Sequence, residues 1–196
     1  MSWCLFHVID GKVMETFAEI VLNNMSTQRA LDFLWAGYGT HRNGFKFYGD
    51  ASGRSGSTNS DFSDYVIIAN DERFKSKECG GRTLHYPPAN PSRHDRFSAA
   101  NAKLCNAKKE VSAFIDPKCV KLIQDLQMRA YAPGTMELPA NEGLLGHISD
   151  AWSYPIYREW PVRFNVSSGA RRVYTSSGEV APYQPLAPWP NTPSNL

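Results

Sequence analysis

The stretch Phe45-Lys-Phe-Tyr-Gly-Asp-Ala-Ser-Gly53 is the part of this chain on which the interpretation of the fold depends most. Phe45, Phe47 and Tyr48 predict a short buried strand, because the run is rich in aromatic residues and is bounded by glycine. Asp50 follows at the carboxyl end of that strand, and small residues after it allow a sharp turn. Ligands of open α/β sheets gather at the carboxyl ends of strands, so an acid here is well placed to hold a metal ion. The alternative is that Asp50 only caps the turn or the next helix.

The composition is that of one folded domain. The chain has 196 residues, of which 42% are hydrophobic and 12% aromatic, and this is enough to bury a core. The net charge of +2 requires no nucleic-acid partner, so an affinity for DNA must rest on local patches. The four cysteines include no Cys-x-x-Cys pair, which favours free thiols in a reducing compartment over a zinc site. The sequence shows no signal peptide, no apolar run long enough to span a membrane and no Gly-x-x-x-x-Gly-Lys-Ser/Thr motif of an ATPase.

Hydrophobic patterns on both sides of the Asp50 stretch predict alternating strands and helices. Residues 2–9 and 12–22 predict an antiparallel hairpin around an Asp10-Gly11 turn. A helix that Ser26 or Thr27 caps is then expected to cross over and place residues 45–48 as a parallel strand. Further patterns predict a helix start at 61–64, strands at 82–86 and 111–115, helices at 92–106, 118–131 and 147–157, and a loop at 132–146.

A second candidate for a metal site lies at His147-Ile-Ser-Asp150, where a loop enters the last predicted helix. His147 and Asp150 are spaced so that they share one helical face. Asp150 can meet Asp50 there, and hard dications such as Mg²⁺ and Mn²⁺ prefer oxygen ligands of this kind. The alternative is that Ser149 or Asp150 is simply the N-cap of the helix. Asp116 precedes a proline and is expected to be a turn residue, so it is a minor candidate for a metal ligand.

Several short motifs occur in a characteristic order. They are Asp-Ala-Ser-Gly at 50–53, Asn-Pro at 90–91, Asp-Arg at 95–96, Asn101, Asn106, Asp-Pro-x-Cys at 116–119 and His-x-Ser-Asp-Ala at 147–151. Each motif is weak alone, but their order and spacing resemble the C-terminal nuclease domain of the large terminase subunit of tailed bacteriophages. The resemblance covers about residues 1–163, and it implies a ribonuclease-H-like α/β fold in which helices flank both faces of a mixed β-sheet. Residues 164–196 form a Pro/Ser-rich tail that we expect to be extended or mobile.

The resemblance implies a metal-dependent endonuclease that cleaves double-stranded DNA during phage genome packaging. Of the three acids of the family, Asp50 matches the second and Asp150 the third, with His147 beside it as a further candidate ligand. The implied reaction is phosphodiester hydrolysis by two Mg²⁺ or Mn²⁺ ions about 3.5–4 Å apart, one activating a water and the other stabilising the leaving oxygen. We expect that Asp50→Asn or Asp150→Asn abolishes cleavage and leaves the fold intact. The implied partners are double-stranded DNA, the terminase ATPase domain, the small terminase subunit and the portal protein, in the host cytoplasm and with no membrane.

Four basic residues are candidates for contacts to DNA phosphates. They are Arg54, Arg93, Arg96 and Lys103, of which the last three follow one face of the helix predicted at 92–106. Contacts of this kind are insensitive to base sequence. The alternative for each of these residues is an ordinary solvated basic face.

The sequence departs from the family at its beginning. The first acid of the family normally lies in a central strand, just before the hairpin that begins here at Met1. In this register the first acid and the first strand are missing, so we expect an incomplete sheet, an unpaired edge at residues 2–9 or 45–48, and either a rearranged hairpin or self-association. We also expect at most one well-bound ion and weak or no cleavage by this chain alone. A rival register takes Asp50, Asp116 and Asp150 as the three acids, but it requires an antiparallel meander where residues 51–70 indicate a loop and a helix.

Two other classes of function fit the same sequence. One is a nucleic-acid-binding module with an incomplete acid cluster, which binds DNA without cutting it. The other is a structural piece that docks on the rest of a packaging motor through its aromatic C-terminal region.

Overall fold

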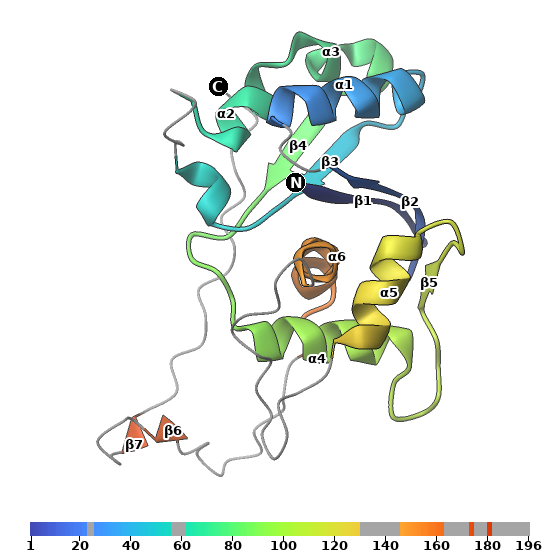
Figure 1. Ribbon diagram of the computed structural model, residues 1–196, viewed down its shortest axis with the longest axis vertical. Coiled ribbons are helices and arrows are strands. Elements are labelled where there is room, and N and C mark those ends of the chain that lie inside the picture. The colour runs from blue at the N-terminus through green and yellow to red at the C-terminus, as the bar shows by residue number, and fades with distance from the viewer. Residues whose placement is uncertain (23–25, 56–61, 130–145, 163–172, 175–179, 182–196) are drawn as a thin grey trace.

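The computed structural model describes residues 1–22, 26–55, 62–129, 146–162, 173–174 and 180–181, and these adopt a mixed α/β fold (Figure 1). The strands are β1 (Ser2–Ile9), β2 (Val13–Val21), β3 (Phe45–Tyr48), β4 (Arg82–His85), β5 (Ala113–Ile115), β6 (Val173–Tyr174) and β7 (Val180–Ala181). The helices are α1 (Thr27–Tyr38), α2 (Asp64–Asn70), α3 (Glu72–Lys75), α4 (Arg93–Leu104), α5 (Val120–Met128) and α6 (His147–Glu159), with 3-10 turns η1 (Ser52–Arg54) and η2 (Lys77–Cys79). The predicted loop at 132–146 falls outside the described residues except for Gly146, and so does most of the predicted tail.

The predicted hairpin is confirmed and forms the edge of a three-stranded sheet. β1 and β2 pair antiparallel, and their register shifts at a bulge between Leu5 and Phe6. Asp10 and Gly11 form the turn with φ angles of 50° and 65°, the left-handed region that tight hairpin turns require. β5 pairs in parallel with β2, so the strand order is β1-β2-β5 and β1 lies at one edge.

β3 and β4 form a separate, two-stranded parallel sheet, while β6 pairs antiparallel with β7. A strand at 45–48 is confirmed, but it is parallel to β4 in a separate sheet, and α1 does not connect it to a hairpin strand of the same sheet. Among the described residues, no backbone hydrogen bond joins β1 to β3. The hairpin has therefore not slid against β3, and each of the two strands keeps one edge unpaired within the described part of the chain.

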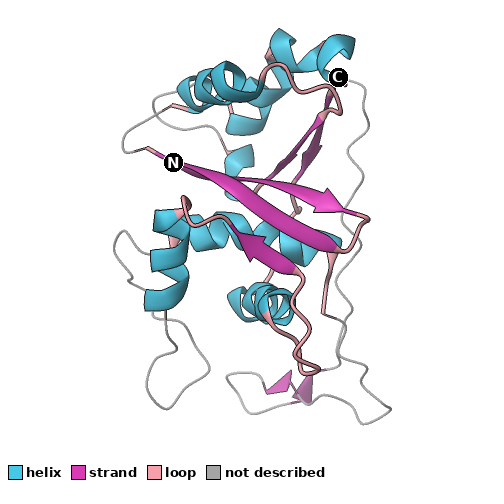
Figure 2. Ribbon diagram, turned by 90° about the vertical axis from the view of Figure 1, so that its right-hand side faces the viewer, coloured by secondary structure: helices cyan, strands magenta, loops and turns pink. Residues whose placement is uncertain are grey.

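Helices lie on both sides of these strands, as predicted (Figures 1 and 2). The helices α1, α2 and α3 share one core with β3 and β4, built from Leu31, Leu34, Phe47, Tyr65, Ile68 and Phe74. Trp3 and Leu5 of β1 pack against this core, whereas Cys4 and Phe6 pack against the other one. This alternation is the period of a strand, and it shows that β1 separates the two cores.

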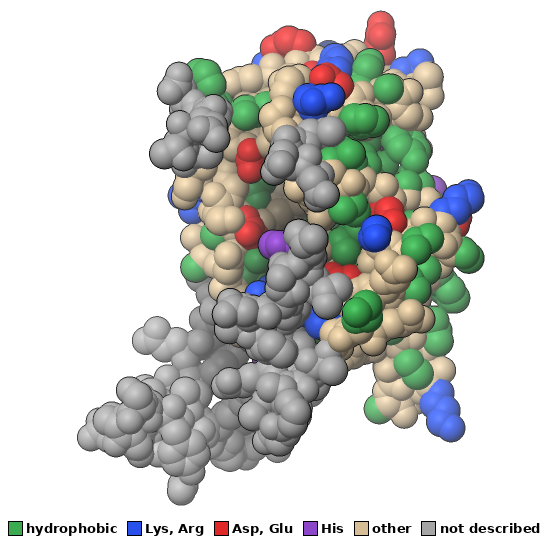
Figure 3. Space-filling model, viewed as in Figure 1, with side chains coloured by type: hydrophobic (Ala, Val, Ile, Leu, Met, Phe, Trp, Pro, Cys, Tyr) green, Lys and Arg blue, Asp and Glu red, His purple; other side chains and the backbone are tan. Residues whose placement is uncertain are grey.

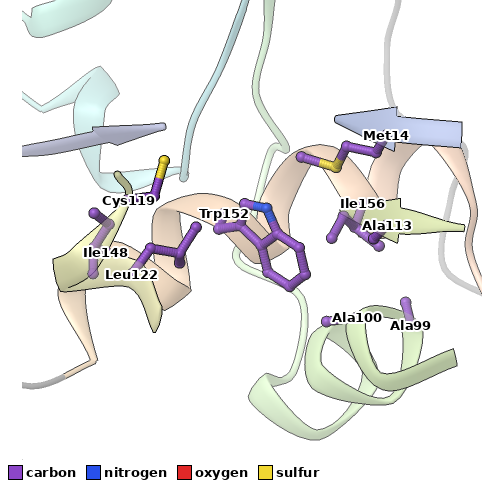
Figure 4. Packing of buried hydrophobic residues seen from close by; sticks show 9 residues of the cluster. All are labelled: Met14, Ala99, Ala100, Ala113, Cys119, Leu122, Ile148, Trp152 and Ile156. Carbon is purple, nitrogen blue, oxygen red and sulfur yellow. The ribbon is translucent and has the colours of Figure 1, made fainter. Parts of the chain in front are cut away.

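The second core lies between the hairpin, β5 and the helices α4, α5 and α6. Trp152 is fully buried at its centre, and its indole Nε1 donates a hydrogen bond to Thr16 Oγ1 at 2.8 Å. Figure 4 shows Met14 and Ala113 on one side of α6 and the small residues Ala99 and Ala100 of α4 on another. Small side chains let α4 approach α6 closely, which fixes the helix that carries Asp150.

The start of α5 is capped by a residue from a different element. Serines cap α1, α2 and α4, but the residue before α5 makes no side-chain cap. The Glu19 carboxylate of β2 instead accepts hydrogen bonds from the backbone N–H groups of Lys121 at 2.9 Å and Leu122 at 2.8 Å. These are among the helix donors that have no partner within the helix itself.

The start of α6 is capped in the same way from α5. The buried Asp125 accepts hydrogen bonds from the backbone N–H of Gly146 at 2.6 Å and of Ser149 at 2.9 Å. The expectation that Ser149 or Asp150 is the N-cap is therefore wrong, because both lie inside the first turn. This frees the Asp150 side chain for other contacts.

The orientation of α5 also differs from a simple amphipathic pattern. Val120 and Met128 are 49% and 63% exposed, whereas Leu122 and Asp125 are buried. The cause is that Asp125 turns inward to reach the start of α6. Within the described ranges, no helix has both the length and the apolar character needed to cross a membrane.

Candidate functional site

A cleft of about 1930 Å³ runs between β1, β3 and α6. Asp50, His147, Asp150 and Tyr154 all contribute to its lining. Its volume is larger than the roughly 300–1,000 Å³ that is usual for a small-molecule pocket. In Figure 3, acidic side chains lie beside a hollow in the middle of the face that is shown.

Asp50 lies directly after β3, where it organises the turn η1. Its carboxylate accepts hydrogen bonds from Ser52 Oγ at 2.7 Å and from the backbone N–H of Gly53 at 3.1 Å. Its backbone carbonyl accepts a hydrogen bond from the Tyr65 hydroxyl at 2.6 Å. Asp50 therefore caps a turn, as the alternative interpretation held, and at the same time lines the cleft.

The glycines beside Asp50 make room for Tyr65. A Cβ atom on Gly49 would lie 2.3 Å from the Tyr65 hydroxyl, and one on Gly53 would lie 2.9 Å from its ring. Tyr65 in turn stacks on Tyr86, with ring centroids 4.0 Å apart. Burial, followed by the nearby Asp50 carboxylate, raises the pKa of Tyr65 well above its ordinary value, so the hydroxyl stays a hydrogen-bond donor.

Asp150 is held by arginines from two other helical segments. Its Oδ1 lies 3.1 Å from Arg96 Nη1 and 3.3 Å from Arg129 Nη1, and its Oδ2 lies 3.9 Å from Arg93 Nη2. The side chains of Arg96 and Arg129 are each 4% exposed, and that of Asp150 is 22% exposed. Three cations surround this one anion, and none of the three is among the residues that line the cleft.

The two buried arginines are also fixed by hydroxyl groups and aromatic rings. Arg96 Nη1 donates to Ser153 Oγ at 2.7 Å, and the guanidinium lies 4.2 Å from the centroid of the Tyr154 ring. Arg129 Nη1 donates to Ser149 Oγ at 2.7 Å. The predicted outward basic face of α4 is thus wrong for Arg96, which turns inward because Asp150 is its counter-ion.

Tyr154 lies within electrostatic reach of both candidate acids. Its pKa is raised to about 12, first by burial, with further upward contributions from the carboxylates of Asp50 and Asp150 and a lowering one from Arg96. Two acids from separate elements therefore act on one buried phenol. Asp50, Asp150 and Tyr154 also all line the same cleft.

The remaining predicted residues divide between the cleft and other places. His147 is exposed and lines the cleft, and Arg54 is exposed in the turn after Asp50. Lys103 lies at the hairpin turn, where its Nζ donates to the Lys12 carbonyl at 2.5 Å. Its Nζ also lies 3.8 Å from the centroid of the Trp160 ring, so Lys103 serves packing.

Asp116 behaves as the predicted turn residue. It follows β5, and its Oδ1 accepts a hydrogen bond from the backbone N–H of Lys118 at 2.8 Å. It is not among the residues that line the cleft. Asp50, His147 and Asp150 thus share the lining of one large cleft, whereas Asp116 does not belong to it.

Sequence reasoning missed Arg129 and Asp125, which position Asp150 and the helix that carries it. No local pattern marks either residue, because their partners lie in a segment far along the chain. Among the described residues, no group of three or more His, Cys, Asp or Glu side chains is arranged to hold a metal ion. Comparison of the chain with models of protein families, with curated proteins and with solved structures found no match.

Proposed function

We propose that this chain is the nuclease part of a phage DNA-packaging enzyme and that Asp50 and Asp150 take part in metal-dependent cleavage of double-stranded DNA. The observation that carries the proposal is that these two acids, which match the motifs of the terminase nuclease domain, line one cleft and both act on Tyr154. A ribonuclease-H-like fold is part of the proposal. It is supported by the mixed strands, by the helices on both sides and by an acid directly after β3.

The two acids fit one hard dication better than two. Asp50 Oδ2 accepts a hydrogen bond from Ser52 Oγ at 2.8 Å, and Asp150 Oδ2 has Arg93 at the longer distance of 3.9 Å. Each carboxylate thus has an oxygen with capacity for Mg²⁺ or Mn²⁺, while Asp150 Oδ1 is engaged by arginines. A bound ion supplies Lewis-acid activation of a water and of the phosphate. A two-ion site requires at least one further acid.

The arginines at Asp150 have a natural role in this chemistry. Arg96 and Arg129 fix the direction of the Asp150 carboxylate, because both are buried and both donate to it. Arg93, with a side chain that is 44% exposed, is the one of the three that a phosphodiester can reach, although it is not among the residues that line the cleft. Arg54, beyond Asp50, is a second candidate for a phosphate contact, and we propose no such role for Lys103. The ATPase domain, the small terminase subunit and the portal protein stay proposed partners.

A non-cleaving DNA-binding or motor-docking module is the second candidate function. It is favoured by the hydrogen bonds that Asp150 already accepts from Arg96 and Arg129, and by the lack, among the described residues, of three or more acids and histidines grouped to hold a metal ion. On this alternative, Asp150 only balances the charge of the buried arginines. The same cleft would then bind without hydrolysis.

A plasmid-nicking assay with Mn²⁺ separates the two functions. The nuclease proposal predicts conversion of supercoiled plasmid to the nicked form, its loss with a chelator, and its loss in Asp50→Asn. Asp116→Asn is the matched control, because Asp116 is a turn residue outside the cleft. If the chain binds DNA in a salt-sensitive gel shift but never nicks it, the second candidate function, a non-cleaving DNA-binding module, is supported. Nicking that persists in Asp50→Asn would overturn the site assignment.

A further inference from the structure

We propose that Tyr65 and Asn90 are positioning residues, which hold the Asp50 carboxylate in one direction by fixing the peptide bond that follows it. The Tyr65 hydroxyl donates a hydrogen bond to the Asp50 carbonyl oxygen at 2.6 Å. Asn90 Oδ1 accepts a hydrogen bond from the backbone N–H of Ala51, also at 2.6 Å. This carbonyl and this N–H belong to the same peptide unit. The unit is therefore held at both of its polar ends by side chains from two other parts of the chain.

The peptide unit between Asp50 and Ala51 decides where the Asp50 carboxylate points. A peptide unit is planar, so its rotation changes only ψ of the residue before it and φ of the residue after it. The donors that hold the carboxylate, Ser52 Oγ and the backbone N–H of Gly53, both come after this unit. Rotation of the unit would move these donors away from the carboxylate. The hydrogen bonds to the unit therefore act on the Asp50 side chain through the backbone.

Side chains are needed here because the sheet ends just before Asp50. The backbone N–H of Gly49 still donates to the His85 carbonyl at 3.1 Å, which continues the pairing of β3 with β4. Among the described residues, the carbonyl of Asp50 and the N–H of Ala51 form no hydrogen bond with another backbone group. Backbone groups that lie outside a ladder take side-chain partners instead.

Tyr65 is itself held firmly by its surroundings. It lies in the first turn of α2 and is buried, and its ring stacks on that of Tyr86. Thr27 of α1 donates a hydrogen bond to the Asp64 carboxylate, which fastens the start of α2. The Tyr65 hydroxyl therefore reaches the Asp50 carbonyl from a packed core.

Asn90 is exposed, but the backbone that carries it is restricted. A run that contains two prolines precedes it, of which Pro87 is fully buried, and the buried Pro91 follows it. Proline fixes its own φ at about −65° and confines the residue before it to extended conformations. The Arg54 guanidinium donates to the Pro88 carbonyl at 3.5 Å, which links this segment to the turn after Asp50 a second time.

The inference rests on the proposed function, because the direction of Asp50 matters only if its carboxylate binds an ion. Groups that orient a metal ligand typically raise the affinity for the metal by about tenfold to a hundredfold. The alternative is a purely structural role, in which Tyr65 and Asn90 stabilise the turn without affecting the carboxylate. The tests therefore measure the side chain of Asp50 and its metal binding, and neither test measures cleavage.

The first test measures the direction of the Asp50 side chain in the metal-free chain. NMR couplings from its carboxyl carbon to its backbone nitrogen and carbonyl carbon report the angle χ1. We expect one rotamer in the wild type and averaging between rotamers in Tyr65→Phe/Asn90→Ala. Asn90→Ala alone, at an exposed position, gives the same readout if the double variant does not fold. An unchanged single rotamer would overturn the proposal.

A matched control removes the same kinds of hydrogen bond elsewhere. Tyr48→Phe loses the hydrogen bond from the Tyr48 hydroxyl to Glu159 at 2.8 Å. Asn106→Ala loses the two hydrogen bonds, each of 2.9 Å, that Asn106 Oδ1 accepts from the backbone. The double variant Tyr48→Phe/Asn106→Ala should keep the single rotamer of Asp50. Averaging to the same extent in this control would also overturn the proposal.

The second test is an electron paramagnetic resonance titration with Mn²⁺. Tyr65→Phe/Asn90→Ala should weaken Mn²⁺ binding at least about tenfold, and it should cause no further loss in a chain that carries Asp50→Asn. Unchanged affinity, or an equal loss in the Asp50→Asn chain, would overturn the proposal, because the two residues would then not act through Asp50. If Asp50→Asn alone leaves Mn²⁺ binding unchanged, the proposed metal site is wrong, and the NMR couplings still decide whether Tyr65 and Asn90 position Asp50.

Discussion

Asp150 is the residue whose role the structure changes most. From the sequence it is a metal ligand or a helix cap, and in the structure it is the counter-ion of two buried arginines. Removal of one partner from a buried charge cluster leaves the others unpaired, which costs more than the loss of one hydrogen bond. Loss of activity in a variant of Asp150 can therefore come from the site itself or from the unpaired arginines. A variant of Asp50 is easier to interpret, because the half-buried Asp50 is held mainly by its own turn.

We predict that the two aspartates separate in their effect on stability. Asp150→Asn should lower the free energy of unfolding by about 2–3 kcal/mol, because Arg96 and Arg129 lose their counter-charge. Asp50→Asn should change it by less than about 1 kcal/mol, since the amide oxygen still accepts from the turn. Urea denaturation of the whole chain measures both. If the two substitutions change the free energy of unfolding equally, Arg96 and Arg129 do not depend on Asp150 for their stability. The expectation from the sequence, that both variants keep an intact fold, would then hold.

His85 should make stability depend on pH. Burial, and then the nearby Arg158 cation, lower the pKa of His85 below its ordinary value of about 6.5. The folded state therefore binds a proton less readily than the unfolded state, and its full stability is present above that value and declines as the pH falls below it. Unfolding measured from about pH 7.5 to pH 5 should show a smaller decline for His85→Gln than for the wild type. His41→Gln is the control, because His41 is exposed. If stability declines less with falling pH in both variants, the pH dependence does not come from His85.

At the scale of elements, α5 and α6 owe their starts to carboxylates on other elements. Glu19 of β2 caps α5, and Asp125 of α5 caps α6. The result is a series in which the hairpin positions α5, and α5 positions the helix that carries Asp150. A cap that links two elements stabilises both the helix and the packing of the pair.

The cap of α5 can be tested by a substitution in the hairpin. Glu19→Ala should destabilise the fold by about 1–2 kcal/mol, because two backbone donors at the start of α5 lose their acceptor. Glu15→Ala is the matched control, since it removes the same side chain from an exposed position of the same strand. Its effect should stay within about 0.5 kcal/mol. If denaturation curves give the two variants the same free energy of unfolding, water replaces the Glu19 carboxylate at the start of α5 with no loss of stability.

These caps also show which elements the sequence could reveal. Of the two residues predicted to cap α1, Ser26 is confirmed as the N-cap, and this could be predicted because a serine cap and its helix are adjacent in the chain. The start of α6 at residue 147 was predicted correctly, but its cap was not, because the capping carboxylate comes from Asp125 in another helix. The same distinction applies to the site. Asp50 was recognisable from the strand and turn around it, whereas the contact of Arg129 with Asp150 exists only after α5 and α6 have packed.

At the scale of the molecule, the two sheets and two cores meet around the cleft. The mixed α/β class followed from the alternation of strand and helix patterns, whereas helices on both faces of a mixed sheet were implied by the family resemblance. The partner of each strand did not, because β3 could pair with the hairpin or with β4 and a local pattern favours neither. The outcome places Asp50 at the end of one sheet and Asp150 on a helix beneath the other, with the cleft between them.

This arrangement leads to a prediction for metal binding by the whole chain. Residues 1–196 should bind at most one Mn²⁺ tightly, because two dications need several grouped anionic ligands and the described residues contain no group of three or more His, Cys, Asp or Glu side chains that could hold a metal ion. Electron paramagnetic resonance titration of free Mn²⁺ measures the stoichiometry without a catalytic readout. Asp50→Asn should weaken the site at least about tenfold, which is 1.4 kcal/mol, and Asp116→Asn should leave it unchanged. Two tight ions per chain, or a loss in Asp116→Asn, would show that the acids are grouped differently.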